Sequence, residues 1–160
     1  MSETNNQKLS SDEVINTVKR LVGFMNIDCQ VEAKSQASGQ GEESVLVSIQ
    51  TPENAKFLIG RNGQNLRALE HVLRAILTKN TNNTVILDVN DYRKSRAVYL
   101  VDVAKQAVTR VRNTQKAEAL FPMSAYERRI VHMELAACPD IATESIGSEP
   151  QRRIIIKPYP

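Results

Sequence analysis

Apolar residues recur at helical spacing near the start of the chain and then change to strict alternation. The helical repeat predicts a helix from Ser10 or Ser11 to about Met25. Alternation of apolar with polar residues over 27–33, and again over 45–49, predicts two half-buried strands. The chain is therefore expected to begin with a helix followed by two strands.

Helical spacing then returns twice before one further alternating run. Pro52 opens a short predicted helix that ends at Gly60, and a longer helix is predicted from about Gln64 to Lys79. Residues 84–89 read as a third strand, which completes the order αββααβ for the first half. The stripe expected to be buried on the longer helix consists of Leu66, Leu69, Leu73, Ile76 and Leu77.

The second half opens with a long predicted helix, about residues 91–116, that has an apolar side and contains neither proline nor glycine. Ser124 and Glu127 then have the S-x-x-E spacing of a capping box, which predicts the start of another helix. Two further strands are expected over 141–145 and 152–157. The predicted order of this half is αβαββ, so the fold class is α+β with two small domains.

Composition and polar segments limit the class of protein. Residues 1–9 are polar and predict a disordered tail, and residues 36–43 predict a loop. The chain has 160 residues, of which 41% are hydrophobic and 24% charged. It has no apolar run of the roughly 18 residues that a membrane-spanning helix needs. We therefore expect a cytoplasmic protein with room for one domain or two small ones.

Charge is distributed unevenly behind the net value of +3. Residues 1–90 carry nine Lys or Arg against ten Asp or Glu, a balance of −1. Residues 91–160 carry twelve against eight, a balance of +4. A cationic surface attracts nucleic acid, so the second half is the better candidate for an electrostatic grip, although many solvated surfaces reach this balance.

The residue counts give little support to metal or disulfide chemistry. The two cysteines, Cys29 and Cys138, lie far apart in the sequence, and only His71 and His132 could supply imidazole ligands. The sequence contains no zinc-ligand spacing and no carboxylate cluster with metal spacing. We therefore expect reduced thiols, no metal, no cofactor and no catalytic residue.

The most informative motif is G-x-x-G, formed by Gly60, Arg61, Asn62 and Gly63 between two predicted helices. Glycine at both ends permits a sharp turn with positive φ. The next helix, expected to start at Asn62 or Gly63, directs its unpaired N–H groups at the loop, which suits a sugar-phosphate backbone. A glycine pair between helices also occurs as a simple tight connection.

Within the order αββααβ, this motif resembles that of a KH domain of the prokaryotic (type II) arrangement, over residues 10–90. The resemblance implies that the loop clamps about four nucleotides. Arg67 lies one turn beyond the loop and shares a helix face with His71 and Arg74, so it is the best placed of the three to contact RNA. A solvated face opposite the leucine stripe is the alternative interpretation.

On the capped helix, Arg128 and His132 are four residues apart and point the same way, to a side that we expect to face solvent. They stand in the run Pro-Met-Ser-x-Tyr-Glu-Arg-Arg-Ile-Val-His, which precedes the blocks Thr-Glu-Ser-Ile-Gly and Pro-Gln-Arg-Arg. Three blocks in this order are similar to the R-x-x-x-H domain found after a KH domain in the bacterial Jag (SpoIIIJ-associated, KhpB-like) proteins. The similarity assigns residues 91–160 to such a domain.

The resemblance implies that Arg128 and His132 form a site for single-stranded nucleic acid. Arginine offers a rigid fork of donors to phosphate, and histidine keeps one donor even when it is neutral. Ser145 and Arg152 or Arg153, on the following strands, are placed to close this pocket. Jag proteins often carry an extra N-terminal domain, whose functions we do not expect here because only a short polar segment precedes the predicted KH domain.

Two functions remain open. The first is a non-enzymatic protein that binds single-stranded RNA at both motifs, in a post-transcriptional role that the resemblance links to cell division or envelope growth. The second is a protein-interaction adapter, for which the resemblance implies a smaller KH partner and an indirect link to a membrane insertase. A nuclease is a distant third, because no second base or metal accompanies Arg128 and His132. Aromatic residues make up only 4% of the chain, so we expect base stacking to be limited.

Overall fold

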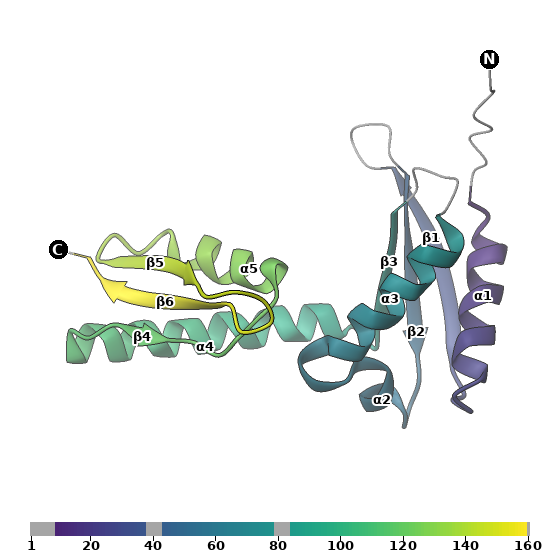
Figure 1. The fold of residues 1–160 in the computed structure, drawn as a ribbon, viewed down its shortest axis with the longest axis horizontal. Coiled ribbons are helices and arrows are strands. Elements are labelled where there is room, and N and C mark those ends of the chain that lie inside the picture. The colour runs from purple at the N-terminus through teal and green to yellow at the C-terminus, as the bar shows by residue number, and fades with distance from the viewer. Residues whose placement is uncertain (1–8, 38–42, 79–83, 160) are drawn as a thin grey trace, which may run out of the picture. The chain divides into compact units, whose positions relative to one another are not determined.

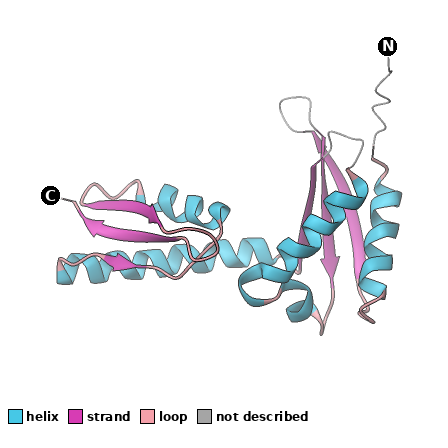
Figure 2. Cartoon of the chain, in the orientation of Figure 1, coloured by secondary structure: helices cyan, strands magenta, loops and turns pink. Residues whose placement is uncertain are grey.

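The structure, a computed structural model, describes residues 9–37, 43–78 and 84–159. The chain divides into two compact units, residues 1–93 and 94–160. Each unit mixes helices with strands (Figure 2), so the predicted α+β class is confirmed. Most of the expected tail, the middle of the expected loop and the expected last residue of the longer helix, Lys79, lie outside the described residues.

Unit 1, residues 1–93, has the predicted order αββααβ with one added turn of 3-10 helix (Figure 1). Strand β3 has the predicted bounds, whereas β1 begins three residues later than expected because Ile27 and Cys29 lie in the connection from α1. The elements are α1 (Ser11–Gly23), β1 (Gln30–Ala37), β2 (Glu43–Gln50), α2 (Ala55–Ile59), the turn η1 (Arg61–Gly63), α3 (Gln64–Leu77) and β3 (Thr84–Val89).

The sheet of unit 1 has the order β1-β2-β3, antiparallel between β1 and β2 and parallel between β2 and β3. Successive side chains of a strand point to opposite faces, so the partners Val47 and Leu87 lie on one face, and both are buried. The three helices supply the other side of this core, chiefly through Val14, Val18, Val22, Leu58, Leu66, Leu73 and Leu77. Only one face of the sheet carries the apolar residues, as the alternation predicted.

Two predictions about this core are wrong. Leu9, which was assigned to the disordered tail, is buried in the core of unit 1. Ile76, which was assigned to the buried stripe of α3, is 50% exposed. The stripe runs through Glu70 instead, and a pattern based on hydrophobicity cannot recognise a charged residue at a buried position. The buried positions of α3 are Leu66, Glu70, Leu73 and Leu77.

Unit 2, residues 94–160, has the predicted order αβαββ. Its sheet has the order β4-β6-β5, and both pairs of neighbouring strands are antiparallel. The elements are α4 (Tyr92–Thr114), β4 (Glu118–Ala119), α5 (Ala125–Leu135), β5 (Ile141–Ile146) and β6 (Arg153–Pro158). The two helices and the sheet share one apolar core, which includes Leu100, Ala104, Val108, Val111, Val131, Leu135, Ile154 and Ile156.

The start of α5 is held by Glu127, which also joins α5 to α4. The capping box is confirmed: Ser124 Oγ accepts from the N–H of Glu127, and Glu127 Oε2 accepts from the N–H of Ser124 at 2.7 Å. Arg96 of α4 donates from Nε to Glu127 Oε1 at 2.8 Å. Burial raises the pKa of Glu127, but the hydrogen bonds from Arg96 and Ser124 outweigh burial, so the pKa lies below its ordinary value.

Candidate nucleic-acid interface

The G-x-x-G loop is a tight turn between α2 and α3. Gly60 and Gly63 have φ angles of 69° and 73°, which confirms the positive φ expected of them, and Asn62 joins them at 52°. Helix α3 begins at Gln64, later than predicted, because the two central residues and Gly63 form η1. Arg61 and Asn62 are exposed, so the tip of the loop presents one cation and one amide to solvent.

Neighbouring side chains leave no room for a larger residue at either glycine. A Cβ at Gly60 would lie 2.5 Å from Cγ of Asn65. A Cβ at Gly63 would lie 2.9 Å from Cε1 of Tyr92. The loop therefore requires glycine at both ends for space as well as for backbone conformation.

Two side chains of α3 hold the backbone around the loop. Asn65 donates from Nδ2 to the carbonyl oxygen of Phe57 at 2.9 Å, and Arg67 donates from Nη1 to that of Asn62 at 2.9 Å. Arg67 is exposed. One of its five N–H donors positions the tip of the loop, and the others are available to a ligand.

A second basic residue of the predicted face, Arg74, has a structural role. Its Nε donates to the carbonyl oxygen of Val85 at 2.8 Å, and its Nη2 lies 2.9 Å from Glu70 Oε1. Glu70 also accepts from the N–H of Leu87 at 2.8 Å and from Arg93. These contacts satisfy backbone groups of β3, which lies at the edge of its sheet, so the solvated-face alternative does not describe Arg74.

Arg128 departs most from the predicted R-x-x-x-H site. It is only 8% exposed, so its predicted position on a solvent-facing side of the helix is wrong. Its Nη1 donates to the carbonyl oxygen of Met123 and to Glu149 Oε1, both at 2.7 Å. The chain before α5 and the turn after β5 therefore enclose the guanidinium. A phosphate that binds Arg128 has to compete with the Glu149 carboxylate.

His132, one turn further along α5, is exposed as predicted. Its Nδ1 is hydrogen-bonded to Thr143 Oγ1 of β5. The register pairs Thr143 with Ile156, and Ile156 is buried in the core, so Thr143 lies on the face of the sheet that α5 covers. Because Nδ1 is engaged, a ligand of this imidazole would be bound through Nε2.

Ser145 and Arg152 meet across the β5–β6 hairpin. Arg152 Nε donates to Ser145 Oγ at 3.1 Å. Arg153 instead donates from Nε to the carbonyl oxygen of Gln151 at 3.2 Å, and as the partner of Ile146 it lies on the opposite face of the sheet from Ser145. Of the two arginines proposed to close the pocket, only Arg152 is placed beside Ser145.

Sequence reasoning missed two residues that contact this site. Thr143 belongs to the Thr-Glu-Ser-Ile-Gly block, so the motif itself contained a signal for it. Glu149 lies in the turn between the strands, where a charged residue is ordinary and carries no signal of the ion pair that it forms.

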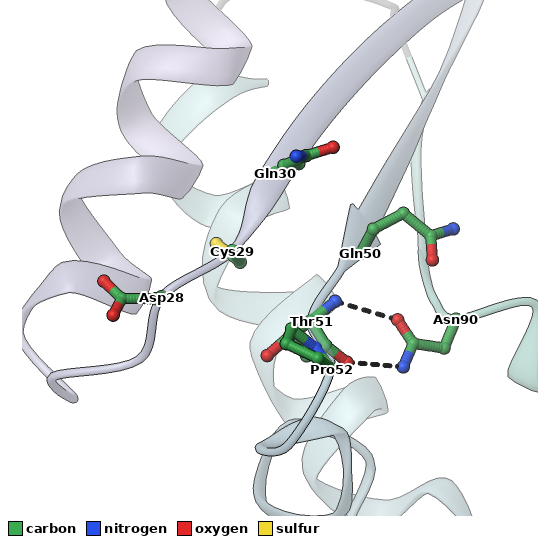
Figure 3. A pocket seen from close by; sticks show the side chains of 7 residues that line it. All are labelled: Asp28, Cys29, Gln30, Gln50, Thr51, Pro52 and Asn90. Atoms are coloured by element: carbon green, nitrogen blue, oxygen red, sulfur yellow. Dashed lines mark hydrogen bonds between the residues drawn. The ribbon is translucent and has the colours of Figure 1, made fainter.

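An open cavity of about 560 Å³ lies where the strands of unit 1 end, and Figure 3 shows its lining. The Asn90 side chain clasps the Thr51 backbone there: Oδ1 accepts from the N–H at 2.9 Å, and Nδ2 donates to the carbonyl oxygen at 2.7 Å. Burial raises the pKa of the Cys29 thiol in the same lining, so little reactive thiolate forms at neutral pH. The lining contains none of the predicted binding residues, and the clasp ties the ends of β2 and β3 together.

The described part of the chain was also searched for metal and membrane sites. Within residues 9–37, 43–78 and 84–159, no three His, Cys, Asp or Glu side chains are grouped so that they could hold a metal ion. None of the described helices combines the length and the apolar character that a membrane crossing requires.

Comparison with known proteins identifies the second unit and the family. Residues 98–158, which include Arg128, His132 and the β5–β6 hairpin, match the family model of the R-x-x-x-H domain. The chain is 29% identical over 147 residues to RNA-binding protein KhpB of Clostridium symbiosum, which covers 91% of this chain and 64% of that protein. It is 32% identical over 130 residues to RNA-binding protein KhpB of Bacillus subtilis (strain 168), which covers 79% and 62%. The chain belongs to the Jag (KhpB) family.

A third member of the Jag family shows the same partial overlap. RNA-binding protein KhpB of Lactiplantibacillus plantarum is 34% identical over 102 residues, which covers 62% of this chain and 32% of that protein. The chain thus spans less than two thirds of the length of these relatives. The match to the R-x-x-x-H domain lies beyond unit 1, where the KH assignment rests on the order αββααβ and on the G-x-x-G loop.

Proposed function

We propose that this Jag-family chain binds single-stranded RNA in the cytoplasm without catalysing a reaction. One observation carries the proposal: Arg61 and Asn62 are exposed at the tip of a loop whose two glycines have positive φ. Glycine lets backbone N–H groups approach a phosphate closely, and Arg61 adds a permanent charge. Arg67 steadies the tip and supplies further donors.

Unit 2, with its R-x-x-x-H motif, supports the proposal with a second group of donors. Arg152 stands beside Ser145, and His132 is exposed one turn beyond Arg128 on α5. Arginine suits the fork of two phosphate oxygens, and an imidazole donor suits a phosphate or a base edge. Arg128 contributes when a phosphate displaces Glu149.

The biological setting rests on the relatives and on the family resemblance. The relatives named above carry the name RNA-binding protein, which favours RNA as the ligand of this chain. A post-transcriptional role linked to cell division or envelope growth, a smaller KH partner and an indirect link to a membrane insertase follow from the Jag family resemblance alone.

A protein-interaction adapter is the second candidate function. Large apolar side chains that are exposed on unit 1 favour it, including Phe24, Phe57, Val72 and Ile76. An adapter does not need an exposed cation at a glycine-bounded loop tip, so we favour RNA binding.

The test is a titration of a labelled single-stranded RNA with the full chain at several salt concentrations. Neutralisation of about four to six phosphates, each contributing about −0.7, predicts a slope of log K against log salt of roughly −3 to −4. A slope near zero would favour the adapter.

A paired variant tests the loop itself. Replacement of Arg61 and Asn62 together by Asp should lower RNA affinity at least about tenfold, or about 1.4 kcal/mol, because two carboxylates would face the phosphates. The fold should persist because both residues are exposed. Asn16→Asp with Lys19→Asp, at exposed positions of α1, changes the charge equally and is the control. Equal affinity of the two double variants would remove the loop from the binding site.

A further inference from the structure

An aromatic pair in unit 2 lies outside the residues assigned to RNA binding. Tyr99 of α4 and Phe121, which precedes α5, have ring centroids 6.3 Å apart and ring planes inclined by 27°. This is the geometry of two offset, stacked rings. Phe121 is partly buried, whereas Tyr99 is 51% exposed, so the pair ends in a ring that is open to solvent.

Arg96 packs against both rings. Its Cζ is 5.3 Å from the centroid of Tyr99 and 5.3 Å from that of Phe121, within the range of cation–π attraction. Its Nη2 is buried and has no hydrogen-bond partner among the described residues, which the neighbouring ring faces explain. Its Nε is held by Glu127 at 2.8 Å.

These contacts fix the rings before any ligand arrives. Glu127 is itself held by the capping box of α5, so a continuous set of bonds connects α5, through Arg96, to the ring of Tyr99. A side chain that is already ordered loses little conformational entropy when a ligand stacks on it. The surrounding sequence is cationic, with twelve Lys or Arg against eight Asp or Glu over residues 91–160.

We propose that Tyr99, backed by Phe121 and Arg96, is a stacking platform for one unpaired base of a single-stranded RNA. The inference rests on the proposed function and adds a base-binding site to phosphate contacts. A flat ring face fits the flat face of a base, and the cationic surroundings favour a polyanion over an apolar protein surface. Because every base has such a face, the platform contributes affinity with little sequence preference.

The chain contains no tryptophan, which permits a direct spectroscopic test. Tyr99→Trp places a single indole on the platform, and its emission is recorded while the full chain is titrated with a single-stranded oligoadenylate. We expect the emission to be quenched as the RNA binds. An oligomer of equal length and charge that lacks the bases should bind without quenching. Equal quenching by the oligomer without bases, or none by either, would overturn the platform.

Affinity gives a second readout with the same oligoadenylate. Tyr99→Ala should weaken binding about fivefold or more, the lower end of what one base–aromatic stack contributes, whereas Tyr99→Phe should bind as the wild type does. Val98→Ala, at another exposed position of α4, is the control and should have no effect. Wild-type affinity in Tyr99→Ala would refute the platform and leave RNA binding standing. A wild-type chain that binds no RNA would refute the proposed function and the platform together.

Discussion

Removal of the charge on Glu149 should strengthen RNA binding, because this carboxylate now occupies the guanidinium of Arg128. The bond from Arg128 Nη1 to Glu149 Oε1 is 2.7 Å long, and the arginine also donates to the carbonyl oxygen of Met123. In Glu149→Gln the amide oxygen still accepts a hydrogen bond, so the arginine should stay in place. A phosphate would then displace a neutral group instead of an anion.

The size of the effect follows from the exposure of the pair. The side chain of Arg128 is only 9% exposed, but that of Glu149 is 59% exposed, so water screens much of the attraction. Partly exposed ion pairs of this kind contribute up to about 1 kcal/mol. The wild type loses that contribution when a phosphate enters and the variant does not, so the affinity of Glu149→Gln should rise about fivefold.

The assay is an equilibrium titration of a labelled single-stranded RNA with wild type and variant at one fixed salt concentration. Glu144→Gln is the matched control, because it also removes one exposed carboxylate from unit 2 and one ion pair, that with Lys157. Ala142, Glu144 and Ile146 alternate with Thr143 and Ser145, so the control lies on the other face of β5. An affinity gain in Glu149→Gln that exceeds the gain in Glu144→Gln supports phosphate binding by Arg128.

Equal gains in the two variants would mean that only net charge matters. Unchanged or weaker binding in a folded Glu149→Gln variant would show that Glu149 positions Arg128 for structure alone. Either result would refute the competition between carboxylate and phosphate.

Three further predictions concern α5. Ser124→Ala should lower the free energy of unfolding by about 1 kcal/mol in chemical denaturation and leave RNA affinity unchanged; weaker binding at unchanged stability would show that Ser124 touches the ligand. His132→Ala should weaken RNA binding and abolish any rise in affinity between about pH 8 and pH 6, where histidine gains its charge; a destabilised variant that binds normally in the cold would remove His132 from the site. Because the pKa of Glu127 is lowered on folding, its contribution to stability should be complete above the ordinary value of 4.5 and disappear as the pH falls through the lower folded value. Thermal melts from pH 7 to pH 3 should therefore show less acid destabilisation in Glu127→Gln than in the wild type, and identical pH profiles would contradict this role.

Local patterns in the sequence predicted much of the fold. Alternation over 84–89 located β3, and the spacing of Ser124 and Glu127 located the start of α5. Such patterns work because helix and strand periods, and the bonds of a capping box, involve residues close in the chain. The positive φ of Gly60 and Gly63 was predictable for the same reason.

The failures share a different cause. Glu70 takes a buried position of α3 because Arg74, Arg93 and β3 provide its partners, and Ile76 is exposed instead. None of these partners is visible in the periodicity of α3 itself. A charged residue in an apolar stripe is therefore read as surface until its partners are known.

The sequence by itself determined the element order αββααβ and αβαββ, the glycine-bounded loop with Arg61 at its tip, and the capped helix that carries the R-x-x-x-H motif. Only the tertiary structure decided that Arg128 is enclosed beside Glu149, which lies 21 positions away, and that Tyr99 meets Phe121 over Arg96. Periodicity reports which side of an element is apolar, because that depends on neighbours along the chain. Burial of a charge and the stacking of two rings depend on which elements meet in space, and no single element encodes its partner.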